Sequence, residues 1–227
     1  MTDYTTGRVR PLVAVGYGPR CVPVMQLAEA AAGLCDLLWM IDTSVPGMSE
    51  MAGLLNRFGA VVDLDGMSTE QVVKTLADWE PDGITTYLDA GMVELACVAE
   101  DLVLPFHSQA TAAALTDKAR QRRALAAAGL DMPPCHLVRP DQSARELLAV
   151  EAEVGWPAVL KPRSAQGSRY TFLARDRAEL ENLLVALGPG RPDMVLEGYL
   201  PDDLARDGDP YAGYVSVESV VANGAIS

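Results

Sequence analysis

The chain has 227 residues, 49% of them hydrophobic, so it can bury a sizeable core in one large or two modest domains. Its net charge of -13 at pH 7 argues against nonspecific nucleic-acid binding, and no apolar run reaches the roughly 18 residues of a membrane-spanning helix. The first ten residues do not resemble a signal peptide, and the four cysteines are widely separated. We therefore predict a cytoplasmic protein with reduced, mostly buried thiols that binds neither nucleic acid nor a membrane.

The first hundred residues alternate strand and helix signals, which predicts an α/β fold with a parallel, doubly wound sheet of Rossmann-like form. Short apolar runs predict strands at residues 11–15, 37–41, 60–64 and 83–86. Helices are expected over 21–32, 51–58 and 91–101, and Ser68 with Gln71 is expected to form a capping box at the start of one more helix.

Gly16 and Gly18 follow the first expected strand, like the start of a dinucleotide-binding fingerprint. The third glycine of that fingerprint is replaced by Cys21, and Pro19 removes an N–H from the turn that would hold a pyrophosphate. We therefore interpret the two glycines as a tight strand-to-helix turn, with dinucleotide binding as the alternative.

The pattern changes after residue 110. One long helix is expected over 111–128, followed by helices over 143–154 and 177–187. Strands are expected over 136–138, 156–161, 171–174, 194–196 and 214–221, with an acidic loop at 201–210. Asn223 and Gly224 are typical of a hairpin turn. Because the sequence ends three residues later, we interpret it as part of a longer protein.

Three segments of the second half contain the residues that we expect to act chemically. Lys118 begins a helix in LTDKARQRRALAAAGLDMPPCHLV, Lys161 ends a strand in VGWPAVLKPRSAQGS, and Glu197 ends a strand in VLEGYL. Only three of the eighteen lysine and arginine residues are lysines, so arginine is the usual cation of this chain. We therefore expect that Lys118 and Lys161 are lysines because a compact point charge is required there. In this order and spacing, and with LPFHSQ before them, these segments resemble the ATP-grasp superfamily, and specifically its carboxylate–amine ligases.

The resemblance covers essentially the whole chain and implies its domain organisation. A Rossmann-like N-terminal domain is expected over 1–106, a linker helix over 107–132, and an α+β ATP-lid subdomain over 133–199. Residues 200–227 would begin a truncated C-terminal subdomain.

The resemblance also implies a reaction. ATP, with Mg²⁺, phosphorylates a small-molecule carboxylate, and an amine attacks the acyl phosphate to form an amide or peptide bond. A homodimer is compatible with this family. The alternatives are a biotin-carboxylase-like carboxylation and a nucleotide-binding module without turnover.

Individual roles follow from the same resemblance. Lys118 and Lys161 would contact the phosphates, beneath a loop of small residues whose N–H groups can approach closely. That loop contributes Ser164, Gln166, Gly167 and Ser168. The hinge that reads adenine through main-chain groups of its second and fourth residues would be Glu197, Gly198, Tyr199 and Leu200. Tyr214 and Glu218 are candidate ribose or substrate contacts.

The sequence also departs from the family pattern. Tyr170 stands where the lid loop usually has a second glycine, which restricts the backbone there. The family's magnesium-binding glutamate and Glu-x-Asn pair have no counterpart before Ser227. We therefore expect no metal ligands in this chain, no ligation by it alone, and structural roles for His107 and His136. Its catalytic residues stay unassigned.

Overall fold

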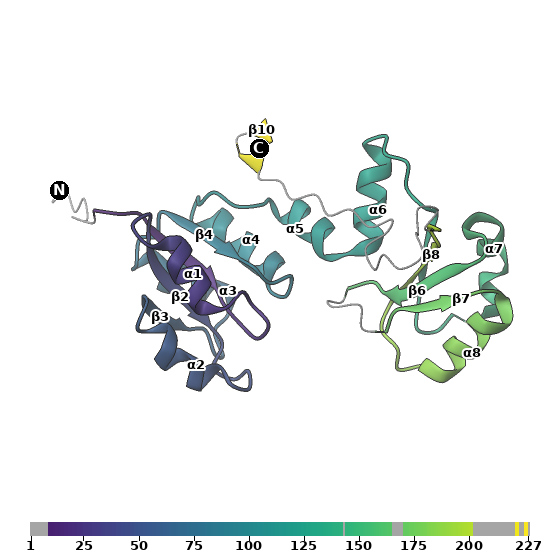
Figure 1. The fold of residues 1–227 in the computed structure, drawn as a ribbon, viewed down its shortest axis with the longest axis horizontal. Helices are drawn as coiled ribbons and strands as arrows, with labels where there is room; N and C mark the ends of the chain where they lie inside the picture. The colour runs from purple at the N-terminus through teal and green to yellow at the C-terminus, as the bar shows by residue number, and fades with distance from the viewer. Residues whose placement is uncertain (1–8, 143, 165–169, 202–220, 223–224, 227) are drawn as a thin grey trace, which may run out of the picture.

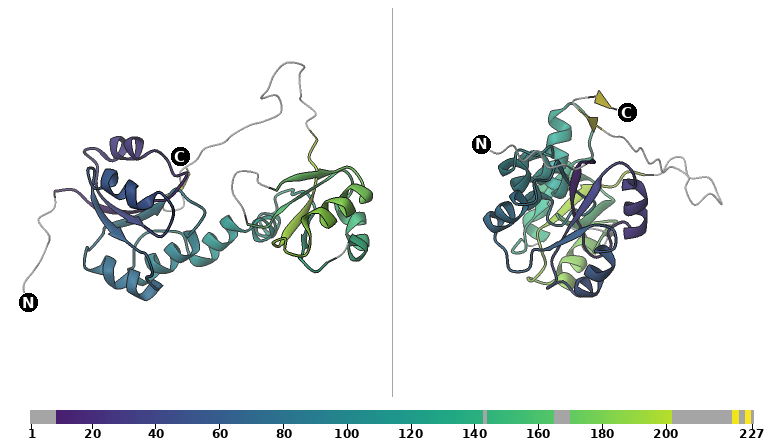
Figure 2. Two further views of the ribbon diagram at one scale, coloured as in Figure 1. Left: turned by 90° about the horizontal axis from the view of Figure 1, so that it is seen from below. Right: turned by 90° about the vertical axis from the view of Figure 1, so that its left-hand side faces the viewer.

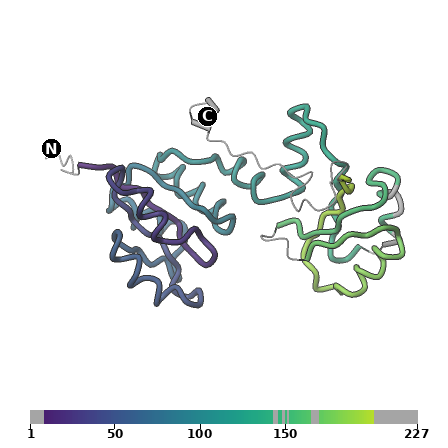
Figure 3. Tube along the Cα trace, viewed as in Figure 1, coloured from purple at the N-terminus to yellow at the C-terminus, as the bar shows by residue number. Residues whose placement is uncertain are grey.

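The structure is a computed structural model that describes residues 9–142, 144–164, 170–201, 221–222 and 225–226. Two sheets lie at opposite ends of the molecule, and the helices α5 (Gln109–Thr116) and α6 (Lys118–Ala127) run between them (Figure 1). The view from below in Figure 2 and the tube in Figure 3 show the same arrangement.

The first sheet is parallel and has the strand order β3-β2-β1-β4. Its strands are β1 (Leu12–Gly16), β2 (Asp36–Ile41), β3 (Ala60–Asp63) and β4 (Gly83–Thr86). The helices that alternate with them are α1 (Val24–Ala31), α2 (Met48–Leu55), α3 (Thr69–Ala77) and α4 (Met92–Asp101).

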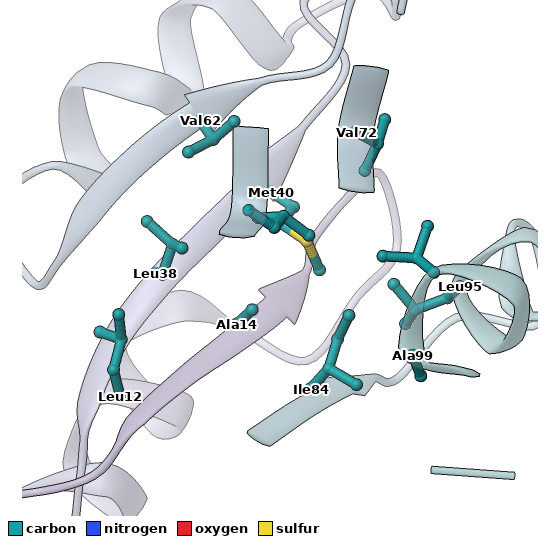
Figure 4. Packing of buried hydrophobic residues seen from close by; sticks show 11 residues of the cluster. Leu12, Ala14, Leu38, Met40, Val62, Val72, Ile84, Leu95 and Ala99 are labelled. Atoms are coloured by element: carbon teal, nitrogen blue, oxygen red, sulfur yellow. The ribbon is translucent and has the colours of Figure 1, made fainter. Parts of the chain in front are cut away.

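Alternate residues of β2 point to opposite faces of this sheet, and both faces are covered. Leu38 and Met40 pack with residues of α3 and α4, a cluster shown in Figure 4. Trp39 and Ile41 pack with residues of α1 and α2 on the other face. A parallel strand buried on both faces needs a continuous apolar run, which LLWMI provides. The predicted doubly wound parallel sheet is confirmed.

The predicted capping box at the start of α3 is also confirmed. The Ser68 amide donates to Gln71 Oε1 at 2.8 Å, and the Gln71 amide donates to Ser68 Oγ at 3.3 Å. Two amides that would lack partners at the helix start are thereby satisfied.

The second sheet is antiparallel and has the strand order β5-β8-β6-β7. Its strands are β5 (Cys135–Val138), β6 (Ala158–Pro162), β7 (Phe172–Ala174) and β8 (Met194–Gly198). One face packs with η1 (Ala144–Leu147), α7 (Leu148–Val154) and α8 (Arg177–Leu187) around Leu160, Leu180 and Leu196. Since side chains alternate along a strand, Lys161 and Glu197 lie on the other face.

The single long helix predicted over 111–128 is wrong. The chain leaves the helical conformation at Asp117, with φ -125° and ψ 107°, and begins again as α6. The linker therefore contains two helices. Asp117 is the N-cap residue of the second helix, and its side chain accepts a hydrogen bond from the Arg120 amide. The helix expected over 143–154 begins as the 3₁₀ turn η1, which is common at helix starts.

The strands β9 (Val221–Ala222) and β10 (Ala225–Ile226) form an antiparallel pair, as expected for the arms of the predicted hairpin, whose turn residues Asn223 and Gly224 lie outside the described residues. The acidic loop and all but the last residue of the strand expected over 214–221 lie outside the described residues. The domain boundaries stay a prediction.

All four cysteines have free thiols, and they are half-buried where greater burial was expected. Within the described ranges, no helix has both the length and the apolar character that crossing a membrane requires.

Candidate nucleotide-binding site

Asp117 fixes the start of α6 and therefore the place of Lys118. Its carboxylate accepts a hydrogen bond from the Arg120 amide at 3.1 Å, which is the bond of a helix N-cap. The amide of Lys118, the first residue of α6, donates to the Arg163 carbonyl just after β6 at 3.0 Å. The helix that begins with the first candidate lysine is thus attached to the strand that ends near the second.

Arg163 strengthens this attachment with its side chain. Its Nε and Nη2 donate to Asp117 Oδ2 at 2.9 and 2.6 Å, and its Nη1 donates to Asp193 Oδ2 at 3.0 Å. Burial disfavours the ionised Asp117 carboxyl, but the hydrogen bonds from Arg163 and the Arg120 amide outweigh it, so the pKa of Asp117 is lowered. We call Asp117, Arg163 and Asp193 the clamp, since they join the start of α6, the end of β6 and the residue before β8.

Glu197 is the centre of a charged cluster on the face of the antiparallel sheet that lies opposite η1, α7 and α8. Only 4% of the residue is exposed. It accepts a hydrogen bond from Arg122 Nε through Oε1, and Lys161 Nζ forms an ion pair with Oε2. Burial raises the pKa of Glu197, but the hydrogen bonds from Arg122 and Lys161 prevail, so its pKa is lowered and it stays ionised at neutral pH.

Lys118 belongs to the same charged cluster. Burial is the largest cause of its lowered pKa, and repulsion by Lys161 and then Arg122 lowers it further. Asp89 and Glu197 act in the opposite direction. Three cations are thus gathered near one buried carboxylate, and the cation at Lys118 is held at an electrostatic cost that a bound anion would relieve.

A cavity of about 470 Å³ lies beside this cluster and includes Lys118 and Ser164 in its lining. The other lining residues come from the loops after β1 and β4 and from α5 and α6: Arg20, Asp89, Ala90, Leu115, Thr116 and Gln121. Ser164 is exposed at the start of the candidate phosphate loop. Gln166, Gly167 and Ser168 lie outside the described residues, and so do Tyr214 and Glu218.

The candidate hinge is fixed by two main-chain bonds. The Gly198 amide donates to the Pro134 carbonyl at 2.9 Å, and the Tyr199 amide donates to the Pro157 carbonyl at 3.1 Å. A Cβ at Gly198 would lie 3.1 Å from the Val154 carbonyl oxygen, so a side chain is poorly tolerated there. Because those two amides already donate hydrogen bonds within the fold, Leu200 is the first residue after them whose amide could donate to a nucleotide base.

Tyr170 has a φ of +57°, in the left-handed region that favours glycine. This is the position where the resemblance to the ATP-grasp pattern led us to expect a glycine. The backbone therefore adopts the glycine-like conformation despite the side chain.

The structure brings together Lys118, Lys161 and Glu197, and their roles toward a nucleotide stay a prediction. Sequence reasoning missed Arg122, Asp117 and Arg163. A signal existed for Arg122, which lies four residues after Lys118 and so on the same side of an α-helix. No such local signal marks Arg163, whose partner Asp117 is 46 residues away.

Among the residues that the structure places, no group of three His, Cys, Asp or Glu side chains could hold a metal ion. The ligands of magnesium stay a prediction. His107 packs its ring near Phe106 at 5.2 Å, and neither it nor His136 takes part in the charged cluster.

No family model matches the chain. The uncharacterised protein y4rH of Sinorhizobium fredii is 30% identical over 148 residues, which are 63% of this chain and 29% of that protein. The chain thus spans less than a third of this curated relative.

Solved structures match over most of the chain. An L-amino acid ligase from Bacillus licheniformis has a TM-score of 0.62 and 20% identity, over 84% of this chain and 44% of that one. N5-carboxyaminoimidazole ribonucleotide synthetase from Thermus thermophilus has a TM-score of 0.61 and 24% identity, over 84% and 48%. The biotin carboxylase domain of a Hydrogenobacter thermophilus 2-oxoglutarate carboxylase, solved as a dimer with MgADP, ADP and bicarbonate, has a TM-score of 0.62 and 19% identity, over 85% and 45%.

At these identities the likeness concerns the fold, and the chain spans about half the length of each solved structure. The chain has the fold of the ATP-grasp carboxylate–amine ligases.

Proposed function

We propose that this chain is the N-terminal and ATP-lid part of a ligase that uses ATP to activate a carboxylate for attack by an amine. The observation that supports this most directly is the cluster of Lys118, Lys161 and Arg122 around the buried carboxylate of Glu197. A triphosphate is the kind of ligand that such an excess of positive charge favours.

The residues present fit the parts of ATP. Lys118 and Lys161 would hold the phosphates, with Ser164 beside them at the cavity that Lys118 also lines. Glu197 and the main chain of Gly198 and Leu200 would face the base, since a strand end presents a carbonyl and an amide at a fixed separation.

Arg122 explains how Lys161 could serve a phosphate without destabilising the sheet. A buried carboxylate that loses its only cation is costly to the fold. Because Arg122 holds Oε1 of Glu197 independently, Lys161 can leave Oε2 for a phosphate oxygen while Glu197 remains paired.

In the proposed reaction, a carboxylate oxygen forms a bond to the γ-phosphorus of ATP. The bond from that phosphorus to the β–γ bridging oxygen breaks, and ADP leaves with the electron pair. The amine then adds to the acyl carbon of the acyl phosphate, loses a proton and expels inorganic phosphate. The protein's contribution in such a transfer is mainly positioning and neutralisation of charge.

Trapping the acyl phosphate tests this function. The full-length protein would be incubated with ATP, magnesium, hydroxylamine and a panel of carboxylic acids that includes the proteinogenic amino acids. We expect acid-dependent ADP release with formation of the corresponding hydroxamate. ADP release that depends on bicarbonate alone would support the carboxylase alternative, and ATP-analogue binding without ADP release under any condition would support a binding module.

A further inference from the structure

Arg20 lies in a tight turn whose backbone conformation is unusual for arginine. The Cys21 amide donates to the Gly18 carbonyl at 3.2 Å, which places Pro19 second and Arg20 third in the turn. The φ of Arg20 is +67°. A third turn position of this kind favours glycine or asparagine, so an arginine there adds backbone strain.

The turn packs closely against the loop between β4 and α4. A Cβ at Gly18 would lie 3.0 Å from Cδ1 of Leu88, in the loop between β4 and α4. Glycine at this position therefore lets the loop after β1 approach the loop after β4. Both loops then reach the same cavity, which Arg20 and Asp89 line.

Arg20 approaches the candidate nucleotide site from the parallel sheet. It lines the cavity of about 470 Å³ together with Lys118 and Ser164, which belong to α6 and to the loop after β6. Asp89 is the acidic residue of the lining, and its charge already acts on Lys118, whose pKa it raises. Arg20 is exposed, and in the described part of the chain no acceptor takes a hydrogen bond from its side chain.

We propose that Arg20 binds the oxyanion that lies beside the terminal phosphate of the nucleotide, namely the carboxylate of the acid substrate. This inference rests on the proposed function. A guanidinium is a planar fork that donates two parallel hydrogen bonds to a carboxylate, and it remains charged throughout the reaction. The same side chain would also neutralise the phosphoryl group once that group has moved to the acid. Lys118 holds the nucleotide side of the subsite, and Arg20 holds the acid side.

The test uses inorganic phosphate as the probe, because phosphate can occupy the oxyanion position when ADP fills the nucleotide site. Isothermal titration calorimetry would measure ADP binding first, and then phosphate binding to the ADP-loaded full-length protein. The variant is Arg20→Asn, since asparagine tolerates the left-handed turn position. The matched control is Arg57→Asn, which removes an exposed arginine at the end of α2 that does not line the cavity.

We expect Arg20→Asn to bind ADP as the wild type does and to bind phosphate about ten- to a hundredfold more weakly, the usual effect of losing a hydrogen bond between charged groups. Its melting temperature should be no lower than that of the wild type, because the strained arginine is gone. Arg57→Asn should bind both ligands normally. Arg20→Lys should lose part of the phosphate affinity, because it keeps the charge without the fork.

Two results would overturn the inference while leaving the nucleotide site intact. These are equal phosphate affinity of Arg20→Asn and the wild type, or no phosphate binding by an ADP-loaded wild type. A wild-type protein that does not bind ADP would overturn the proposed function, and this inference with it.

Discussion

Lys161 and Arg122 share one carboxylate: Lys161 contacts Oε2 of Glu197, and Arg122 donates to Oε1. The two cations come from different elements, β6 and α6, and meet at a residue that is 4% exposed. This contact, the clamp and the buried Arg191 have four measurable consequences.

Replacing Lys161 with methionine should weaken binding of a nonhydrolysable ATP analogue. Losing one hydrogen bond between charged groups costs about 1.5–3 kcal/mol, or roughly ten- to a hundredfold in affinity. Titration calorimetry would compare this variant with Lys74→Met, which removes a lysine from the last turn of α3. Equal affinities of the two variants would exclude Lys161 from the nucleotide site.

Glu197→Gln should change how stability depends on pH. The pKa of Glu197 is lowered from its ordinary value of 4.5 in the folded protein. A carboxyl with a lowered pKa adds stability above its unfolded-state pKa, and that stability is lost as the pH falls through the folded-state value. The wild-type melting temperature should therefore drop as the pH falls below about 4.5, and the variant should drop less.

The control for this series is Glu181→Gln, at an exposed position of α8. It should follow the wild-type curve. Identical slopes for Glu197→Gln and the wild type would show that Glu197 is not held in its ionised form by the fold. Part of the acid sensitivity should persist in Glu197→Gln, because the pKa of Asp117 is lowered as well.

Asp117→Ala should cost more stability than Asp176→Ala, although both remove an N-cap. Asp176 caps α8 by accepting from the Glu179 amide at 2.9 Å, so its loss should cost about 1 kcal/mol. Asp117 caps α6 and also accepts two hydrogen bonds from Arg163. Chemical denaturation should show the larger loss at Asp117, and ATP-analogue affinity should fall only there, since only this cap positions Lys118.

Arg191→Met should loosen the antiparallel sheet without affecting the parallel one. Arg191 is 8% exposed and donates to the carbonyls of Gly188, Arg139 and Gln142 at 3.2, 3.0 and 2.5 Å. Methionine would leave these acceptors without that donor, at a cost of about 1–3 kcal/mol. Hydrogen exchange should quicken in residues 135–198 and stay unchanged in residues 12–101. Faster exchange in both regions would show that the two sheets unfold as one unit.

The parallel sheet could be predicted because the sequence signals for its strands and helices lie within short segments of the chain. LLWMI is apolar throughout, which suits a strand covered on both faces, and Ser68 with Gln71 marks a helix start within four residues. Lys118, Lys161 and Glu197 could be proposed as candidate site residues because each lies within a short motif at a strand end or a helix start. None of these inferences depends on a contact between distant segments.

Helix propensity does not predict the break at Asp117, although the motif around Lys118 places that lysine at a helix start. Alanine-rich sequence continues on both sides of it, so local propensity favours one helix. The break is fixed by Arg163, whose position relative to Asp117 depends on how β6 packs against the start of α6. Arg122 was missed for a similar reason, since its contact with Glu197 spans 75 residues. The domain boundaries, the candidate ribose contacts and the loop residues 165–169 stay predictions.

The break between α5 and α6 also determines which parts of the molecule can travel together. Gln109 of α5 donates to Glu100 of α4 at 2.7 Å, so α5 is attached to the parallel sheet. The Lys118 amide and the clamp attach α6 to the antiparallel sheet. Any swing of one sheet toward the other would therefore pivot at Asp117, carrying Lys118 with one body and Arg20 with the other. The separation of Arg20 and Lys118 across the cavity would then change with the distance between the two sheets.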